Sequence, residues 1–302
     1  SLAYLLRHDT VYRNWDHSVV IDGDNLVIDG KKIPVFAVKN PAEIPWGSVS
    51  ADVVVESTGL FTTYDSAGGH ITGGAKHVVI SAPAKQGIDA GVQGETILLG
   101  VNEELFGTCN VTSNASCTTN ASSPLIGILD QALGIEKALL STTHGYTASQ
   151  SLVDGPSKKD LREGRAAAQN IVPSSTGAAI AVTVAYPKLT GLFDGISLRV
   201  PVPAGSIVDI TFITKRDTTA DEVNEILTNA SRDPRWAGIF TVTNEPLVSS
   251  DILGSTYASI ADLAMTRVVG GNLVKVLAWY DNEWGYTHTL VEHVIKAGNS
   301  GK

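Results

Sequence analysis

Two short runs of β-branched residues place the strongest constraint on the fold of this chain. Residues 52–56 (DVVVE) and 77–80 (HVVI) lack the alternation of polar and apolar side chains that a half-exposed strand would show. Unbroken runs of this kind are typical of parallel strands that are buried on both faces. Residues 62–75, between them, predict a helix with a glycine-rich end, so the three segments predict a β–α–β unit. A third apolar run at 96–101 is expected to extend this open α/β domain to about residue 116.

The segments on both sides of this unit favour antiparallel pairing. Residues 17–37 contain three short β runs separated by the turn sequences DGDN and DGKK, which predict hairpins. The second half of the chain carries long β-type segments with few helices between them, which favours a mostly antiparallel sheet. These segments lie at 138–143, 192–200, 206–213, 238–242 and 274–280, and helical spacing occurs at 219–231 and 284–297.

Composition argues against several classes of protein. The 302 residues suffice for two domains, and a content of 43% hydrophobic and 18% charged residues is typical of a globular protein. The 22 basic and 31 acidic residues give a net charge of −9, which argues against binding to nucleic acid or to a membrane surface. No apolar stretch approaches the roughly 20 residues of a membrane span. The two cysteines, Cys109 and Cys117, form no disulfide framework, so we expect a reducing compartment.

The N-terminal residues predict that the chain is part of a longer sequence. The chain has no initial Met and opens directly on a helix-like pattern of Leu2, Leu5 and Leu6, with no strand before it. Residues 1–6 are too short for a signal peptide and lack its basic region. We therefore expect the N-terminus to be a break in a longer parent sequence.

Cys117 and His144 are the most informative residues for chemistry. Cys117 stands in residues 113–120 (SNASCTTN), between a β-like stretch and residues 124–129, which predict a helix. Unpaired backbone N–H groups at a helix start favour a thiolate, so we expect a lowered pKa for the Cys117 thiol. His144 alongside would stabilise the thiolate and shuttle protons. A buried structural Cys and a core His are the commoner alternatives for the two residue types alone, but the polar neighbours of Cys117 favour catalysis.

Five ordered motifs resemble those of the phosphorylating glyceraldehyde-3-phosphate dehydrogenase family. They are residues 56–59 (ESTG), 80–84 (ISAPA), 113–120 (SNASCTTN), 175–179 (STGAA) and 279–286 (WYDNEWGY). The resemblance implies an α/β fold, with an incomplete Rossmann-type cofactor domain and an α+β catalytic domain that has a mostly antiparallel sheet. It implies a cofactor domain of residues 1–116, completed by a C-terminal helix at 283–302, and a catalytic domain of residues 117–282.

The resemblance also implies a reaction, the oxidative phosphorylation of D-glyceraldehyde 3-phosphate to 1,3-bisphosphoglycerate with NAD. Cys117 would attack the aldehyde carbon to give a thiohemiacetal, and His144 would accept the proton. Hydride transfer to NAD would leave a thioester on Cys117, which inorganic phosphate would then open. The family resemblance further implies a glycolytic or gluconeogenic role and a cytoplasmic homotetramer. We expect no metal and no nucleic-acid or membrane partner.

Two phosphate groups would have to be held near Cys117. In the resemblance, Thr147 and Arg199 would hold the substrate phosphate, and the guanidinium of Arg199 is a donor fork suited to that anion. The residues that would hold the attacking phosphate are Ser116, Thr118, Thr176 and Gly177. Each Ser or Thr taken alone is more often a helix cap or a turn residue.

The cofactor residues that the resemblance implies are spread along the chain. Asn282 would fix the nicotinamide carboxamide, and Ser81 and Lys39 would contact the cofactor. Tyr286 would either lie near the nicotinamide ring or serve only as a helix-packing aromatic. No G-x-G-x-x-G sequence occurs in these 302 residues, so we expect the pyrophosphate cradle and the acidic ribose contact to precede Leu2.

Some positions depart from the family pattern. Ala121 stands in place of a second cysteine, and Glu163 stands where many bacterial members carry Arg near the attacking phosphate. Residues 146–172 match the loop that lines the cofactor pocket of a neighbouring subunit, and Pro156 within it resembles NAD-using members. Two alternatives stay open at this point. The chain could act on another phosphorylated aldehyde, such as erythrose 4-phosphate, or it could be a non-catalytic fragment or binding module.

Overall fold

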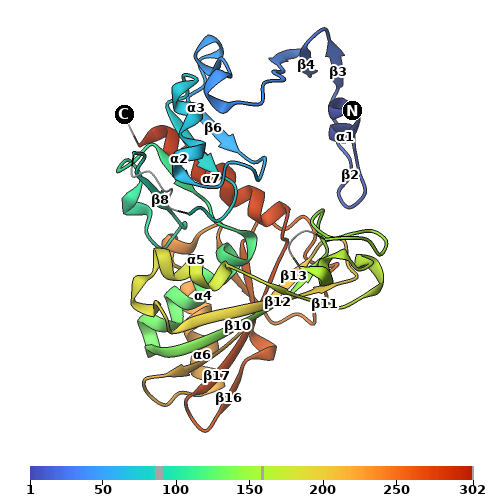
Figure 1. Ribbon diagram of the computed structural model, residues 1–302. Coiled ribbons are helices and arrows are strands. Elements are labelled where there is room, and N and C mark those ends of the chain that lie inside the picture. Colours follow the sequence, from blue (N-terminus) through green and yellow to red (C-terminus); the bar gives the residue numbers. More distant parts are fainter. Residues whose placement is uncertain (86–90, 158–159, 301–302) are drawn as a thin grey trace.

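A computed structural model describes residues 1–85, 91–157 and 160–300 of the chain. The part nearer the N-terminus contains a four-stranded sheet in the order β6-β7-β9-β8, and all its neighbouring strands are parallel (Figure 1). Its strands are β6 (Val53–Glu56), β7 (His77–Ile80), β8 (Gly94–Thr96) and β9 (Val111–Ser113). Val78, Val79 and Ile80 of β7 are fully buried, which confirms the prediction of burial on both faces for that strand. In β6, which is parallel as predicted, Val55 is 39% exposed, so burial on both faces is wrong for this strand.

The connection between β6 and β7 contains the predicted helix in two pieces, α2 (Tyr64–Ala67) and α3 (Gly69–Thr72). Thr63 caps α2 by accepting a hydrogen bond from the backbone N–H of Ser66 at 3.2 Å. The third apolar run, at 96–101, contributes only Thr96 to a strand, β8. The side chain of Asn102 accepts from the backbone N–H of Leu98 at 2.8 Å and donates to the Thr96 carbonyl at 2.9 Å, so the chain turns there.

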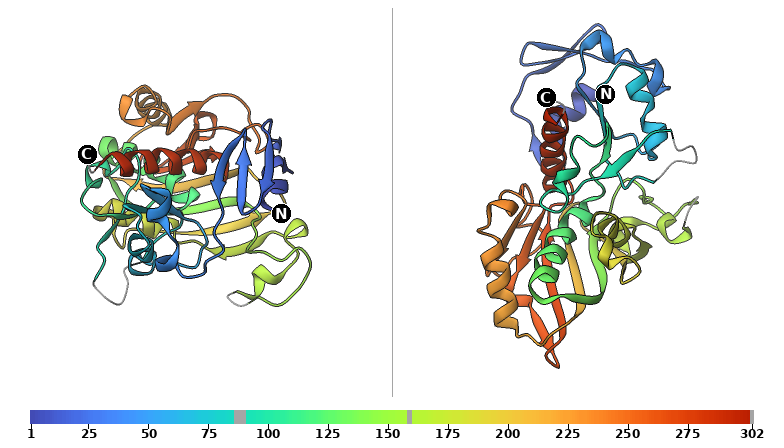
Figure 2. Two further views of the ribbon diagram at one scale, coloured as in Figure 1. Left: turned by 90° about the horizontal axis from the view of Figure 1, so that it is seen from above. Right: turned by 90° about the vertical axis from the view of Figure 1, so that its left-hand side faces the viewer.

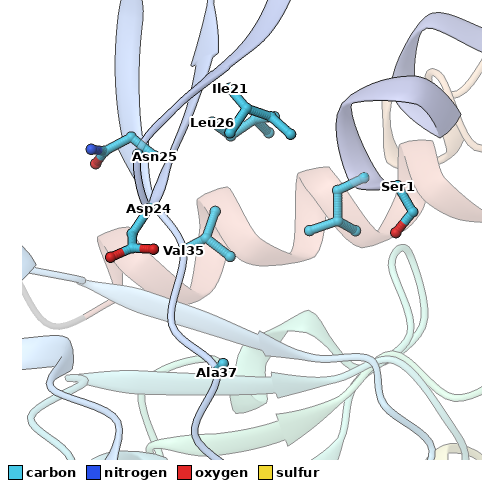
Figure 3. A pocket seen from close by; sticks show the side chains of 9 residues that line it. Ser1, Ile21, Asp24, Asn25, Leu26, Val35 and Ala37 are labelled. Atoms are coloured by element: carbon cyan, nitrogen blue, oxygen red, sulfur yellow. The ribbon is translucent and has the colours of Figure 1, made fainter.

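The first 40 residues form a separate arm beside the parallel sheet (Figure 1). The arm contains α1 (Leu2–Arg7), the short pair β1 (His8–Asp9) and β2 (Arg13–Asn14), and the antiparallel strands β3 (Val19–Asp22), β4 (Asn25–Ile28) and β5 (Lys31–Pro34). The three-stranded part confirms the predicted hairpins. An open groove of about 300 Å³ separates the start of α1 from this sheet, and Figure 3 shows its lining. The Tyr12 hydroxyl donates to Asp281 at 2.7 Å and so attaches the arm to the second half of the chain.

The second half of the chain contains an eight-stranded sheet in the order β11-β12-β10-β13-β17-β15-β14, with β16 paired to β17. Only β10 with β12 and β14 with β15 are parallel, so the sheet is mostly antiparallel, as predicted. The strands are β10 (Ile135–Gly145), β11 (Val172–Ser175), β12 (Phe193–Val200), β13 (Ser206–Thr214), β14 (Phe240–Thr243), β15 (Ser259–Asp262), β16 (Arg267–Val269) and β17 (Leu273–Tyr280).

Among residues 1–85, 91–157 and 160–300, helices cover one face of this sheet and leave the other uncovered. They are α4 (Cys117–Leu133), α5 (Ala178–Ala185) and α6 (Ala220–Ala230), and the right-hand view of Figure 2 shows helices packed along the sheet. Leu125 and Leu129 of α4 meet Ile210 and Phe212 of β13 in the core. On the uncovered face, Leu139 of β10 is 67% exposed. Because register partners share a face, Asp194 of β12 and Thr211 of β13 lie on the same face as Leu139.

The last helix, α7 (Trp284–Asn299), returns to the parallel sheet and lies against β6 and β7 (Figures 1 and 2). His293 of α7 is buried, and its Nε2 lies 2.7 Å from the Thr112 hydroxyl of β9. The division into residues 1–116 with 283–302 and residues 117–282 stays a prediction, and residues 301–302 lie outside the described part. No helix in the described residues is long and apolar enough to cross a membrane.

Candidate active site

Cys117 is the first residue of α4 and follows β9 after a turn of three residues. Within this turn, Ala115 adopts a left-handed conformation with φ of 53°, which is uncommon for a residue other than glycine. Its carbonyl accepts from the Tyr286 hydroxyl at 3.1 Å, and its N–H donates to the Ser113 hydroxyl at 3.0 Å. The Asn120 amide donates to the carbonyls on either side of Ala115, at 2.8 and 3.0 Å. The turn that presents the thiol is therefore fixed by hydrogen bonds.

His144 lies next to the thiol, as the sequence predicts. Its Nε2 is 3.4 Å from the Cys117 Sγ, and its side chain is buried near the end of β10. The parallel pairing of β10 with β12 sets His144 directly beside Arg199. Cys117 and Arg199, which are 27 and 55 residues from His144 along the chain, thus both lie beside it at the end of β10.

Arg199 contacts His144 directly, which the sequence does not predict. One guanidinium nitrogen, Nη1, lies 2.7 Å from His144 Nδ1 and 3.2 Å from the Gly145 carbonyl. The Arg199 Nε is buried and has no hydrogen-bond partner among the described residues. The guanidinium therefore has unused donor capacity beside the Cys117–His144 pair, and a bound anion would satisfy it.

Tyr280, the last residue of β17, connects α4 and β10, the elements that carry Cys117 and His144. Its hydroxyl lies 2.9 Å from the Thr118 hydroxyl and 2.8 Å from the Thr142 hydroxyl, and its ring packs edge-on against His144. Its place in the motif at 279–286 could have suggested a role in the site. Because β17 buries every second side chain, Tyr280 falls on the helix-covered face.

The protonation states differ from the sequence expectation. Burial raises the pKa of the Cys117 thiol, and this effect outweighs hydrogen bonds from Thr118 and the charge of Arg199. The predicted lowering of the Cys117 pKa is therefore wrong for this structure, because desolvation of the sulfur exceeds the effect of the helix start. Burial, together with the charge of Arg199, lowers the pKa of His144 to about 4. At neutral pH the pair is a thiol beside a neutral imidazole, so His144 can accept a proton.

The predicted phosphate residues lie around this pair with different surroundings. Ser116 caps α4 by accepting from the Thr119 N–H at 3.2 Å. Thr147, just after β10, is half-buried and lies 3.1 Å from the Ser149 hydroxyl. Thr176 accepts from the Ala178 N–H at 3.2 Å.

Gly177 and Glu163 lie beside this second group. Gly177 is exposed before α5, and a side chain there would meet no atom within 4 Å. The Glu163 carboxylate accepts a hydrogen bond from the Ser174 hydroxyl at 2.9 Å. Ser174 stands two residues before Thr176, so this hydrogen bond brings a negative charge close to Thr176 along the chain. In the part of the chain that the structure describes, no hydrogen bond joins Thr147 or Thr176 to Cys117, so their roles stay predictions.

The predicted cofactor residues lie in three places, with Ser81 at the carboxyl edge of the parallel sheet, Asn282 after β17 and Lys39 in the arm. Ser81 follows β7, and its hydroxyl lies 3.0 Å from that of Tyr286. Asn282 accepts at its Oδ1 from the Gly205 N–H and the Ser206 hydroxyl, at 3.0 and 2.9 Å. Lys39 is exposed between β5 and the turn at Pro41–Glu43, apart from this edge. In open parallel sheets this edge is where dinucleotides bind, and its hydroxyl and amide groups fit the polar parts of NAD.

A buried hydrogen-bonded chain behind this edge holds the loop after β6. Glu56 accepts from the Thr58 N–H at 2.8 Å and lies 2.9 Å from His70 Nε2. The Trp46 indole donates to His70 Nδ1 at 3.0 Å. The sequence motif at 56–59 identifies Glu56, but nothing in the sequence indicates that His70 and Trp46 are its partners.

Comparisons with known proteins are in accord with the sequence resemblance. Residues 116–282 match the family model for the C-terminal domain of glyceraldehyde 3-phosphate dehydrogenase, and residues 1–64 match the model for its NAD binding domain. A protein named glyceraldehyde-3-phosphate dehydrogenase 2 from Streptomyces avermitilis is 47% identical over 299 residues, which cover 98% of this chain and 87% of that protein. Glyceraldehyde-3-phosphate dehydrogenase from Mycobacterium bovis is 46% identical over 303 residues, which cover 99% of this chain and 87% of that protein.

Proposed function

This chain belongs to the glyceraldehyde-3-phosphate dehydrogenase family, and we propose that it performs the family's reaction through Cys117 as nucleophile and His144 as base. The activity is the NAD-dependent oxidation and phosphorylation of glyceraldehyde 3-phosphate to 1,3-bisphosphoglycerate. The observation that carries the residue assignment is the 3.4 Å separation between Cys117 Sγ and His144 Nε2. No other cysteine shares this environment, because Cys109 directs its thiol to the Val111 carbonyl at 3.3 Å.

The first step joins Cys117 to the aldehyde carbon of the substrate. The neutral imidazole of His144 takes the thiol proton as the carbon–sulfur bond forms, and it returns that proton to the carbonyl oxygen to give a thiohemiacetal. A neutral base suits this step, because the low pKa of His144 keeps the imidazole unprotonated until substrate is present. The fixed turn at Ala115 keeps the sulfur in position for attack.

The later steps release an acyl phosphate. Ser81 and Asn282 would hold NAD, which would supply the hydride acceptor for oxidation of the thiohemiacetal to a thioester. His144 takes the hydroxyl proton of the thiohemiacetal as the hydride leaves. An oxygen of inorganic phosphate attacks the thioester carbon, the carbon–sulfur bond breaks, and Cys117 leaves as a thiolate that regains a proton from His144.

The anion sites follow from charge and donor geometry. Arg199, with its partnerless buried Nε, and Thr147 would hold the phosphate of the substrate. The attacking phosphate would lie among Ser116, Thr118, Thr176 and Gly177. The exposed Gly177 before α5 supports this assignment, because its backbone leaves open space for an anion at a helix start. Lys39 would contact the cofactor from the arm.

The uncovered face of the eight-stranded sheet supports a homo-oligomer. Leu139 and Ile196 are 67% and 54% exposed on it, and an Asp209–Lys275 ion pair lies on the same face. A second copy of this sheet would bury the apolar side chains, and the homotetramer is our proposal for the full assembly. The loop at 146–172 would then line a neighbouring cofactor pocket, although residues 158–159 of it lie outside the described part. Two free cysteines suit a reducing compartment, and we propose the cytoplasm.

The experiment that tests this function follows NADH formation from glyceraldehyde 3-phosphate, NAD and inorganic phosphate. Turnover that requires all three reactants supports the proposal, and turnover without phosphate contradicts it. The same assay with erythrose 4-phosphate tests the alternative substrate. A higher kcat/KM for erythrose 4-phosphate than for glyceraldehyde 3-phosphate would show that erythrose 4-phosphate is the preferred substrate. Absence of NAD binding to the chain would favour a non-catalytic fragment.

A further inference from the structure

The loop after β6, residues 57–60, presents open backbone at the carboxyl edge of the parallel sheet. It follows Glu56, whose backbone carbonyl accepts from the Ser81 N–H at 2.9 Å. Gly59 in this loop has φ of 72°, and a side chain there would meet no atom within 4 Å. Among the residues that the structure describes, the Gly59 N–H has no hydrogen-bond partner. The loop therefore offers a free backbone donor to a ligand that binds beside Ser81.

The shape of this loop depends on the Glu56 carboxylate. One oxygen, Oε1, accepts from the Thr58 N–H at 2.8 Å and also from the Thr58 hydroxyl. The Thr58 hydroxyl oxygen in turn accepts from the Leu60 N–H at 3.1 Å. Two backbone N–H groups of the loop are thus tied to one side chain, directly or through one hydroxyl, and Gly59 lies between them.

The Glu56 carboxylate is buried and needs hydrogen-bond donors in place of water. Glu56 is 3% exposed, and in the described part of the chain no Lys or Arg pairs with it. Its second oxygen, Oε2, lies 2.9 Å from the Nε2 of His70 in α3, a residue that is 4% exposed. A proton on Nε2 supplies Oε2 with its donor. Without that proton, two lone pairs would face each other.

Trp46 determines which ring nitrogen of His70 carries the proton. The indole N–H of Trp46 donates to His70 Nδ1 at 3.0 Å, and an indole nitrogen has no acceptor capacity. Nδ1 must therefore present its lone pair, so the proton of the neutral ring sits on Nε2 and is donated to Glu56. A second ring proton would face the indole N–H. Every donor between Trp46 and Leu60 in this buried chain thus meets an acceptor.

We propose that His70 is a positioning residue that acts through Glu56 to hold the loop 57–60 in the shape that receives NAD. Trp46 fixes the tautomer of His70 that this role requires. The inference rests on the proposed function, in which Ser81 contacts NAD, and dinucleotides bind at the carboxyl ends of the strands in open parallel sheets. A loop that already has its bound shape in the free protein increases affinity, because binding then carries no cost for ordering it.

Two substitutions at His70 break the chain at different ends. In His70→Gln, the side-chain amide nitrogen replaces Nε2 as donor to Glu56, and the Trp46 indole loses its acceptor. In His70→Asn, the shorter amide accepts from Trp46 but does not reach Glu56. Each variant loses one buried hydrogen bond, so we expect similar losses of stability. Only His70→Asn should raise the Kd for NAD, by about tenfold, because the carboxylate that holds the loop has lost a donor.

Calorimetric titration with NAD measures the Kd, and hydrogen–deuterium exchange without NAD reports on the loop itself. We expect the peptide that contains residues 57–60 to exchange about tenfold faster in His70→Asn and at the parent rate in His70→Gln. Tyr64→Phe removes a buried hydrogen bond to Thr96 in the same half of the chain, so it is the control for lost stability and should leave both readouts unchanged. Equal effects of the two His70 variants, including no effect of either, would overturn the proposal.

A double substitution tests the role of Trp46. In Glu56→Gln, the amide NH₂ must face either the His70 Nε2–H or the Thr58 N–H, so we expect a Kd for NAD about tenfold higher. With Trp46→Phe added, Nδ1 can carry the ring proton and Nε2 can accept from the amide, so the Kd should return to within about threefold of the parent value. Additive losses in the double variant would overturn the fixed tautomer. Failure of the parent chain to bind NAD would instead contradict the proposed function, and exchange of residues 57–60 without NAD would still decide whether His70 holds the loop.

Discussion

The Tyr286 hydroxyl of α7 donates to the carbonyl of Ala115, a left-handed residue two positions before Cys117. This bond ties the last helix of the chain to the turn that presents the thiol. The same hydroxyl lies 3.0 Å from Ser81, and burial raises the pKa of Tyr286 to about 12, so it remains a donor over the working pH range. Tyr286 therefore combines a place near the cofactor edge with a structural bond to the nucleophile turn.

Tyr286→Phe removes this bond without removing the ring. We expect the free energy of unfolding to fall by about 1 kcal/mol and kcat to fall by about tenfold, because the sulfur loses its fixed position. Alkylation of Cys117 without NAD reports on the turn alone and should also slow. A change confined to the KM for NAD would instead assign Tyr286 only to ring contact. Tyr4→Phe, at an exposed tyrosine of α1, is the matched control.

Buried histidines predict a loss of stability in acid. Burial lowers the pKa of His293 to about 4, and that of His144 is lowered to about 4 as well, against about 6.5 for an unfolded histidine. Because the folded state holds these histidines neutral, the free energy of unfolding is independent of their protonation above about pH 6.5. It decreases as the pH falls from about 6.5 toward 4, where only the unfolded state binds the proton. In that window each histidine lowers the free energy of unfolding by up to about 1.4 kcal/mol per pH unit.

Denaturant unfolding between pH 7 and pH 5 measures this dependence. His293→Leu should flatten the pH dependence of the unfolding free energy by up to about 2 kcal/mol across that window. His8→Gln, at an exposed histidine of β1, should leave the slope unaltered. Equal slopes for His293→Leu and the parent chain would show that His293 is not the buried group responsible.

Glu163 is predicted to weaken phosphate binding. Its carboxylate lies 2.9 Å from the Ser174 hydroxyl, near the proposed site of the attacking phosphate at Thr176. Glu163→Gln should lower the KM for phosphate about threefold, since one partly exposed charge contributes under about 1 kcal/mol. The KM for glyceraldehyde 3-phosphate should stay constant. Glu225→Gln on α6 is the control, and a KM for phosphate that does not fall would remove Glu163 from this site.

The apolar sheet face predicts the effect of charge on assembly. Leu139→Glu places a carboxylate in the middle of the proposed contact, and we expect a smaller species in sedimentation velocity at equal protein concentration. Val248→Glu, at an exposed residue outside the strands of this sheet, should preserve the assembly. An unchanged mass for Leu139→Glu would place the interface elsewhere.

Local patterns predict much of this fold, because their physical causes are local. The runs at 52–56 and 77–80 become β6 and β7, and the octapeptide at 113–120 predicts that Cys117 begins a helix. The extent of the run at 96–101 is not predictable in the same way. Its end depends on the side chain of Asn102, which binds the backbone at Leu98.

The electrostatics of the site depend on contacts between distant segments. The sequence shows that Cys117 begins a helix, but the burial that raises its pKa comes from packing against the core of the second half of the chain. The contact between Arg199 and His144 depends on the register of β10 with β12. A resemblance to a family can assign Arg199 to a phosphate. Only the register reveals that it also reaches the base.

The most direct test of the account traps the covalent intermediate. The enzyme is mixed with NAD and glyceraldehyde 3-phosphate without inorganic phosphate, quenched in acid, and analysed by peptide mass spectrometry. We predict an acyl adduct on Cys117, a stoichiometric burst of NADH, and the loss of both in Cys117→Ser with its circular dichroism spectrum unaltered. An adduct on another residue, or a full burst in Cys117→Ser, would contradict the assignment of Cys117 as nucleophile.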